Sequence, residues 1–536
     1  MAIRRSPHRR GLIGLAAAAA LVPLALAGCS PSSSPGADGD ADASISMAVT
    51  DPGILIPGRQ TVAFDYASVV WAPLTFIRDD GTLEYVQAES VESDDQQTWT
   101  ITLRDGWTFH DGTPVTAQDY VDTWNWVAYG PNTAENSGQL VGIEGFDEVN
   151  PADGGEPETE EMSGLEVVDD LTFRVTLKQP DGQFPLQLSQ GQTATFPMPA
   201  SAFDDVDAYN RHPVGNGPFA MSDDYVEAET ITVAAYDDYA GDEPTVEQID
   251  FVPYVDMNTA YTDVQAGNLD IVFVPPSRLA QAEADFGDRF VAFDAPGISF
   301  LGLSLWEDRF EDVRVRQAIS MAIDRETINE QLYAGTYTPA SAWTPIVEVG
   351  TPEGICGEFC EYDPDAAAEL LEEAGGFEGS LDIVFPGGGG LDELYNAIAN
   401  NLRQNLGIDA TATPTADWAE FAERRMAGDI SGAFFSRWGA LYPSQQATMR
   451  EVYLSSGGCD NCVPWYSDDV SEALAEADQQ PSTDGSAYVA VQEILQDAFP
   501  VPPLFSESYP YVTTERIAEM PAASGSPVLR EIVVAE

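Results

Sequence analysis

The sequence predicts an α/β protein made of about three domains or lobes. Strand-like and helix-like patterns alternate along the chain, and we find no short internal repeat. Hydrophobic residues make up 44% of the 536 residues, which is enough for a large core and excludes a disordered polyanion. At roughly 150 residues per domain, this length corresponds to about three domains.

The N-terminal residues 1–28 are expected to direct export and to be removed. Four arginines precede an uncharged run rich in Ala and Leu, as in a secretory signal. The run ends at Leu26-Ala27-Gly28-Cys29, which resembles a bacterial lipobox whose cysteine receives the lipid. We therefore predict lipidation of Cys29 and anchoring at the outer face of the cytoplasmic membrane. A plain signal peptide, or a transmembrane anchor with an incidental cysteine, is the alternative.

Residues 29–43 are rich in Ser, Pro, Asp and Ala, and we expect them to be a disordered tether. The pair Arg9-Arg10 also resembles a twin-arginine signal, so the export route, Sec or twin-arginine, stays open.

The charge balance excludes several functions. The chain has 89 Asp and Glu against 23 Lys and Arg, and loss of the four arginines in 1–28 lowers the formal charge from −66 to −70. A surface this acidic repels nucleic acid, so no nucleic-acid partner is expected. The one lysine, Lys178, lies outside any Gly-Lys-Ser/Thr motif, which excludes a P-loop NTPase. Three histidines are too few for a typical multi-histidine site, and we expect neither a metal nor a cofactor.

Four cysteines besides Cys29 form two close pairs, Cys356 with Cys360 and Cys459 with Cys462. In an exported protein they predict two disulfides, for which three connectivities are possible, and we favour the two local bridges. A structural zinc site is the alternative, although the 98 residues between the pairs far exceed the spacing in a zinc ribbon.

The first half of the chain has clear strand and helix patterns. Alternating apolar residues predict strands at 99–103 and 171–177. Thr116, with Asp119 three residues later, is predicted to open a helix. The segment 147–161 is acidic and rich in Pro and Gly. We expect a solvated loop there, because its carboxylates lack the spacing of a calcium loop.

The second half is predicted to be more helical. One apolar stripe predicts a helix at 315–323, Asp363-Pro364 starts another that stops at Gly375-Gly376, and a third stripe at 394–406 is closed by Gly407. Further helices are predicted at about 415–427, 467–477 and 484–498, followed by a proline-broken strand at 501–505.

Several segments in a fixed order resemble one family. The stretch 103–117, Leu-Arg-Asp-Gly-Trp-Thr-Phe-His-Asp-Gly-Thr-Pro-Val-Thr-Ala, is similar to the signature of family 5 extracellular solute-binding proteins, the oligopeptide and dipeptide receptors of ABC importers. The segments 213–219, 312–318 and 322–325 match further motifs of this family. The resemblance extends from about residue 45 to the C-terminus.

This resemblance implies a two-lobed fold of the periplasmic-binding-protein type II, or Venus-flytrap, kind with an additional family-specific domain. Lobe I would be discontinuous and consist of 44–84, 208–297 and 506–536. The additional domain would span 85–207, and lobe II 298–505. The strands that cross between the lobes would form a hinge.

The implied function is capture of an extended peptide in the cleft between the lobes. Hinge closure would hold the peptide, and the closed receptor would deliver it to the permease and ATPase subunits of an ABC importer. A monomer is expected.

Parts of these motifs invite a chemical interpretation, but each has a structural one. His110 beside Asp111-Gly112-Thr113-Pro114 is expected to fix a turn by hydrogen bonds rather than to form an acid–base pair. Gly215 and Gly217 suit a tight backbone crossing. A salt-bridged polar helix face is expected for four charged residues, Arg314, Arg316, Asp324 and Arg325.

The predicted ligand contact is similar to the family's Trp-x-x-Asp-Tyr segment, whose aspartate pairs with the α-ammonium group of a peptide. In this chain the segment comprises Trp438, Gly439, Ala440, Leu441 and Tyr442. Leu441 occupies the aspartate position. A leucine cannot neutralise a buried cation, so either another carboxylate does so or the ligand has no free N-terminal amine. Trp438 either stacks on a ligand or plugs the core.

Further candidates are weaker. Arg437 would grip a ligand carboxylate or neutralise a neighbouring acid. Tyr66 and Ser68 lie in a segment where the family often lines its cleft. Asp417 and Asp429 are carboxylates near Leu441 in sequence, although the sequence does not place them in the cleft.

Two other functions remain as alternatives. The same receptor could carry a non-peptide solute such as an oligosaccharide, an opine or a metal chelate, and the leucine at position 441 favours this. An exported hydrolase would need a nucleophile and a base. The sequence has neither a Gly-x-Ser-x-Gly elbow nor a His-Glu-x-x-His helix, so we do not expect an enzyme.

Overall fold

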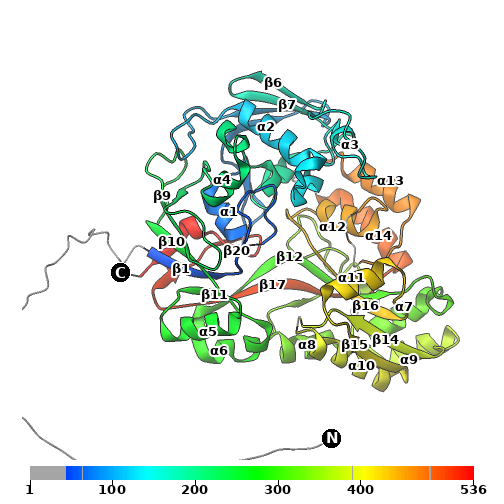
Figure 1. Cartoon of the computed structure of the whole chain (residues 1–536). Coiled ribbons are helices and arrows are strands. Elements are labelled where there is room, and N and C mark those ends of the chain that lie inside the picture. Colours follow the sequence, from blue (N-terminus) through cyan, green and yellow to red (C-terminus); the bar gives the residue numbers. More distant parts are fainter. Residues whose placement is uncertain are drawn as a thin grey trace, which may run out of the picture. The chain divides into compact units, whose positions relative to one another are not determined.

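The computed structural model describes residues 44–62, 64–388, 390–457, 459, 462–481 and 485–535. The predicted signal, tether and lipidation site at Cys29 lie outside these residues. Helices and strands alternate along the described chain, as expected of an α/β protein (Figure 1). Among the described residues no helix is both long and apolar enough to cross a membrane.

The largest sheet of the described chain joins two groups of strands. Its order is β15-β14-β16-β12-β17-β11-β1-β10-β9-β8, with β13 paired to β17. The strands are β1 Ser44–Val49, β8 Phe219–Met221, β9 Ile231–Ala235, β10 Gln248–Pro253, β11 Ile271–Phe273, β12 Phe290–Leu303, β13 Thr338–Pro339, β14 Ser380–Phe385, β15 Asp409–Pro414, β16 Ala433–Gly439 and β17 Pro503–Thr513. We refer to the β11-to-β8 side, with the segments 50–84 and 514–535 that pack along it, as lobe I and to the β16-to-β15 side as lobe II.

Two long antiparallel strands, β12 and β17, connect the lobes. Residues 290–294 of β12 pair with 508–512 of β17. After a register shift residues 298–300 pair with 503–506 of β17, and residues 297–303 pair with β16. The lobe boundaries expected at 297/298 and 505/506 therefore fall inside these two strands. Each lobe has its own core, around Phe251 in lobe I and around Ile383 in lobe II.

Helices cover both sides of this sheet. In lobe I they include α1 Phe64–Val70, α4 Val206–Arg211, α5 Met257–Ala266 and α6 Leu279–Phe286. In lobe II they are α7 Val313–Met321, α8 Arg325–Leu332, α9 Pro364–Glu373, α10 Asp392–Leu406, α11 Trp418–Met426, α12 Gln445–Tyr453, α13 Asp468–Ala477 and α14 Val489–Ala498. Figure 1 shows α5 and α6 beside β11, and α9 and α10 beside β14 and β15.

The helices begin and end at the residues that the sequence predicted to cap them. The Asp363 side chain accepts a hydrogen bond from Ala366 N and begins α9, whereas Gly407 adopts a left-handed conformation with φ 67° and ends α10. The predicted strand at 501–505 is the beginning of the longer β17. Local residue chemistry was therefore sufficient for most of these boundaries.

A separate four-stranded sheet, β4-β5-β7-β6, forms the additional domain. It contains β4 Ala88–Glu92, β5 Thr98–Leu103, β6 Leu165–Asp169 and β7 Thr172–Thr176, and the helices α2 Ala117–Ala128 and α3 Phe146–Val149 belong to the same region. The alternation in β5 buries Trp99 and Ile101 against α2. At the start of α2, the Asp119 carboxylate accepts hydrogen bonds from Thr116 N at 2.8 Å and Thr116 Oγ1 at 2.6 Å.

His110 joins the additional domain to lobe I. Its Nε2 lies 3.0 Å from the carbonyl oxygen of Gly217, and Gly215 N donates to its Nδ1 at 3.2 Å. Burial lowers the pKa of His110 to about 4, so the ring is neutral at pH 7. These contacts agree with the structural role expected for His110, because they connect the stretch 103–117 to the segment 213–219.

The glycines of the second motif cross α1 closely. A Cβ on Gly215 would lie 2.0 Å from the carbonyl oxygen of Val70, and one on Gly217 would lie 2.5 Å from that of Val69. Only glycine allows the two backbones to approach this closely.

The expected salt-bridged face around α7 is correct for Arg314 alone. Arg314 pairs with Asp312 at 2.6 Å, but Arg316 and Arg325 are 8% and 2% exposed and hydrogen-bond to carbonyl oxygens. Burial lowers the pKa of Arg325 to about 10. The guanidinium groups of these two arginines donate hydrogen bonds to backbone carbonyl oxygens of the segment 498–503 and so connect α7 and α8 to that segment.

Cys356 is bonded to Cys360 and Cys459 to Cys462, the local pairing that was favoured. Both bridges lie in lobe II. The zinc alternative for these four cysteines is wrong in this structure, because each sulfur is part of a disulfide.

Candidate functional site

The predicted ligand segment lies where the hinge strands enter lobe II. Trp438 and Gly439 end β16 and pair with Ile298 and Gly297 of β12. Ala440 N then donates to the carbonyl oxygen of Pro296 at 2.7 Å. One backbone edge of the segment is therefore occupied by β12.

Side chains of this segment pack between the two lobes. Ala440 and Tyr442 are buried in a small apolar cluster with Ile77 and Leu186, and Trp438 packs against the cluster's edge. Trp438 Nε1 donates to the carbonyl oxygen of Ala447 at 3.1 Å. In this conformation Trp438 is partly buried and packs against both this cluster and a core cluster of lobe II.

Leu441 is the most accessible residue of the segment, with 40% of its surface exposed. Its side chain supplies no charge to the region, and its carbonyl oxygen faces Gly191. The two nearby aspartates do not replace the missing carboxylate. Asp417 caps α11 by accepting a hydrogen bond from Glu420 N at 2.9 Å, and Asp429 is exposed after that helix.

Arg437 has a carboxylate partner within the protein. Its Nε and Nη2 donate to Glu507 of β17 at 2.8 and 2.6 Å, and Glu507 is 5% exposed. The Glu507 charge raises the pKa of Arg437 against the opposing effect of burial. Neutralisation of a neighbouring acid is thus the alternative that the structure favours over capture of a ligand carboxylate.

Tyr66 and Ser68 belong to α1 and do not line an open surface together. Tyr66 is fully buried in the lobe I core, where its ring meets Trp71 and Phe251 edge-on at centroid distances of 6.0 Å. Ser68 is half-buried, and its hydroxyl donates to the carbonyl oxygen of Asp65 at 2.8 Å. The expectation that Tyr66 lines the cleft is wrong in this conformation, because the aromatic ring is needed for the core.

A cavity of about 230 Å³ lies between the lobes, and we call it the interlobe cavity. Its walls come from the turn between β2 Thr75–Ile77 and β3 Leu83–Tyr85, from β12, from the turn between β19 Ala522–Ala523 and β20 Ser526–Pro527, and from two loops of lobe II. The lining includes Arg78, Asp79, Phe293, Asp294, Pro443 and Ser524.

The interlobe cavity is acidic. Arg78 is bound to Glu84 at 3.0 Å and to Glu531 at 2.8 Å, so its charge is already neutralised by other acids. Asp79 accepts one hydrogen bond from Ser524 N at 3.1 Å. Burial raises the pKa of Asp79, and the charge of Asp294 raises it further, although the Ser524 hydrogen bond opposes both. A cationic group in this cavity would relieve the repulsion between the two carboxylates.

No local sequence pattern pointed to Asp79 and Asp294 as site residues. Asp79-Asp80-Gly81 is typical of a polar turn, and Asp294 lies within a strand pattern. A larger cavity of about 450 Å³ lies near Gly375 and Gly407, at the ends of α9 and α10. Its lining comes from lobe II alone, so we place the candidate site at the interlobe cavity.

Comparison with known proteins gives consistent matches. The model of bacterial extracellular solute-binding proteins, family 5 (middle), matches residues 82–459. The oligopeptide-binding protein OppA of Bacillus subtilis (strain 168) is 25% identical over 493 residues, which cover 87% of this chain and 88% of that protein. The probable deoxycholate-binding periplasmic protein YgiS of Escherichia coli (strain K12) is 24% identical over 477 residues, 85% of this chain and 86% of that protein.

A solved structure agrees in fold over nearly the whole length. The periplasmic murein tripeptide-binding protein MppA, in its unliganded open form, superposes with a TM-score of 0.78 at 21% identity, and the match covers 92% of this chain and 97% of that chain. The two-lobed type II fold implied by the sequence motifs is therefore confirmed.

Proposed function

Because this chain belongs to family 5 of the bacterial extracellular solute-binding proteins, we propose that it captures oligopeptides for an ABC importer. It would be held at the outer face of the membrane by a lipid on Cys29 and would deliver its cargo to a permease served by ATPase subunits. The relatives named for peptide binding support the ligand class.

The observation that carries this proposal is the interlobe cavity. Both lobes contribute to its walls, and β12 and β17 are the strands on which one lobe would rotate against the other. A ligand that touches both lobes stabilises the closed state by its greater affinity for that state, which is what hinge closure requires.

The acidic lining indicates how a peptide would be recognised without an aspartate at position 441. Asp79 and Asp294 would accept a cationic group of the ligand, either the α-ammonium or a basic side chain. This supports the first of the two predicted explanations for Leu441, in which another carboxylate does the neutralising.

Native mass spectrometry of the purified protein is the first experiment, because it detects a retained ligand of any class. A mixed pool of tri- to octapeptides should then raise the melting temperature. Absence of any peptide adduct, together with no shift in melting temperature, would refute the peptide proposal.

The role of the cavity is tested by Asp79→Asn and Asp294→Asn, which keep the size of both side chains. We expect peptides with a free amine or a basic side chain to bind about tenfold weaker to the double variant, corresponding to about 1.4 kcal/mol. N-acetylated peptides with neutral side chains should bind equally to both proteins. The matched control is Asp153→Asn on the exposed loop at 151–155.

A non-peptide solute is the second candidate. Leu441 supports it, and one relative is named for binding deoxycholate rather than a peptide. Binding of such a solute in the absence of peptide binding would favour this candidate over the first.

Catalysis is not part of the proposed function. Both ring nitrogens of His110 are engaged by backbone groups of Gly215 and Gly217, and His212 pairs with Asp224 at 3.1 Å on the exposed surface. Neither histidine lines the interlobe cavity. Peptide cleavage that is lost in His110→Gln or His212→Gln variants with an intact fold would reopen the hydrolase alternative.

A further inference from the structure

The segment 181–192, which we call the docking segment, leaves the additional domain and meets lobe II. Gly182 N donates to the carbonyl oxygen of Asp478 at 2.6 Å. A Cβ on Gly182 would lie 1.9 Å from the carbonyl oxygen of Gln480, and a Cβ on Gly191 would lie 1.9 Å from that of Leu441. Glycine at both positions permits this close contact.

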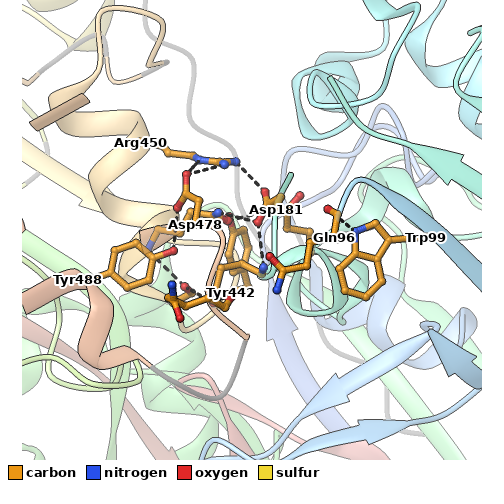
Figure 2. A network of polar contacts seen from close by, with 12 residues as sticks. Gln96, Trp99, Asp181, Tyr442, Arg450, Asp478 and Tyr488 are labelled. Carbon is orange, nitrogen blue, oxygen red and sulfur yellow. Dashed lines mark hydrogen bonds and ion pairs between the residues drawn. The ribbon is translucent and has the colours of Figure 1, made fainter. Parts of the chain in front are cut away.

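The centre of the contact is one arginine between two aspartates. Arg450 of α12 binds Asp181 at 3.0 Å and Asp478 at 2.6 Å (Figure 2). The side chains of Asp181 and Asp478 are 6% and 4% exposed, whereas that of Arg450 is 23% exposed. Burial disfavours the charged guanidinium, but the two carboxylates outweigh this effect and raise the pKa of Arg450.

Asp181 is attached firmly to the additional domain. Its backbone N–H donates to the carbonyl oxygen of Gln96 at 2.8 Å, and Trp99 Nε1 donates to the same oxygen at 3.0 Å (Figure 2). Trp99 is part of the buried core of this domain. We therefore expect Asp181 and the additional domain to move together.

The network extends to the predicted ligand segment. The Tyr442 hydroxyl donates to Gln446 Oε1 at 2.9 Å, and Gln446 Nε2 donates to Asp181 Oδ1 at 2.9 Å. Ser444 Oγ also donates to Gln183 Oε1 at 3.0 Å. Residues 442–446, directly after Leu441, therefore take part in the same contact as the charges.

We propose that Arg450, with Asp181 and Asp478, is an electrostatic clasp that sets the fraction of closed receptor. The clasp rests on the proposed function, because it requires the lobes to move. In the observed contact two acids share one buried place, and Arg450 is the positive charge between them. Opening would remove Asp181 from Arg450 and Asp478 of lobe II. When the docking segment withdraws, all three charged groups regain water, so the contact can form and break repeatedly.

The variant that tests the clasp is Arg450→Met, which keeps a long apolar stem and removes the charge. Spin labels at Glu160→Cys in the additional domain and Glu476→Cys in α13, both exposed, report the distance across the contact. We expect the population at the longer distance to rise at least fivefold without ligand. The matched control is Arg174→Gln, an exposed arginine paired with Glu166 away from the contact.

A second variant separates repulsion from loss of packing. Adding Asp181→Asn and Asp478→Asn to Arg450→Met removes the unpaired acids and should restore most of the shorter-distance population. A distance distribution unchanged by Arg450→Met, with only a lower melting temperature, would overturn the clasp and leave a static interface.

The labels need no ligand, so this result is independent of ligand identity. If the clasp variant opens the protein but no peptide binds, the clasp stands and the peptide proposal fails. If peptides bind the unaltered receptor and Arg450→Met neither opens it nor weakens binding, the clasp fails and the peptide proposal stands.

Discussion

The additional domain makes two very different contacts, one with lobe I and one with lobe II. At lobe I the contact is made of neutral groups: His110 binds Gly215 and Gly217, and Asn216 Nδ2 donates to Gln87 Oε1 at 2.6 Å, with Asn216 and Gln87 1% and 0% exposed. At lobe II the docking segment is held by Arg450 between Asp181 and Asp478.

This difference indicates which contact is permanent. Separating the buried neutral groups at lobe I would break their matched hydrogen bonds, and the backbone crossing around them would also have to come apart. New hydrogen bonds to water in a partly open protein would restore less free energy than this separation costs. The charged side chains of the lobe II contact are largely buried while the contact is formed, but charged groups are strongly hydrated once they are exposed. We therefore expect the additional domain to stay with lobe I and to leave lobe II when the receptor opens.

The largest expected effect comes from Gly215→Ala at the neutral contact. The new Cβ would lie 2.0 Å from the carbonyl oxygen of Val70, a backbone atom that can move only with α1. We expect a loss of about 3 kcal/mol or more in the free energy of unfolding, measured by urea denaturation. Gly138→Ala, where a Cβ meets nothing within 4 Å, is the control and should cost far less.

The next effect is a pH dependence centred on His110. Its pKa is lowered from 6.5 to about 4 in the folded protein, so the unfolded chain binds the proton first as the pH falls. Stability should therefore decrease between pH 6.5 and pH 4, by up to about 3 kcal/mol from this residue. His110→Gln should remove that part of the pH dependence in urea titrations. An equally steep loss in the variant would show that other groups are responsible.

Gly182→Ala compares the two contacts directly. A Cβ there would meet the carbonyl oxygen of Gln480 at 1.9 Å, as close as in Gly215→Ala, but only while the docking segment is seated. For a reversible contact we expect a stability loss below about 1 kcal/mol and a ligand affinity about tenfold lower, because closure becomes harder. A stability loss as large as that of Gly215→Ala would mean that this contact is permanent as well.

The smallest effect is expected for Arg174→Gln. Arg174 pairs with Glu166 across two strands at 3.0 Å, but the two side chains are 44% and 65% exposed. A surface ion pair of this kind contributes about 0.5 kcal/mol or less. Thermal unfolding should shift by no more than about 1–2 °C, and a larger shift would indicate that surface charges stabilise this very acidic chain more than expected.

Much of the fold could be predicted from short stretches of sequence. Asp363 and Gly407 mark helix ends through their own side-chain and backbone chemistry, and the alternation in 99–103 specifies a half-buried strand. The motif around Gly215 likewise predicted a backbone crossing, although not the helix that it crosses.

Much less of the candidate site could be predicted from short stretches of sequence. Leu441 was recognised as a departure from the family pattern, but Asp79 and Asp294 belong to distant segments and carry no local signal. For the same reason the sequence could not show that Tyr66 is buried, nor decide between the two predicted roles of Arg437. One side chain is used by the core, and the other is paired with Glu507 of a different strand.

The sequence by itself determined the alternating elements, their caps, the family and the unusual leucine at position 441, because each depends on residues close together in the chain. Only the tertiary structure decided which charges meet. Asp181 and Arg450 are 269 residues apart, and they meet only because the fold places the additional domain against lobe II. The energy of a buried charge depends on its partner and on its loss of water, and neither is encoded in neighbouring residues.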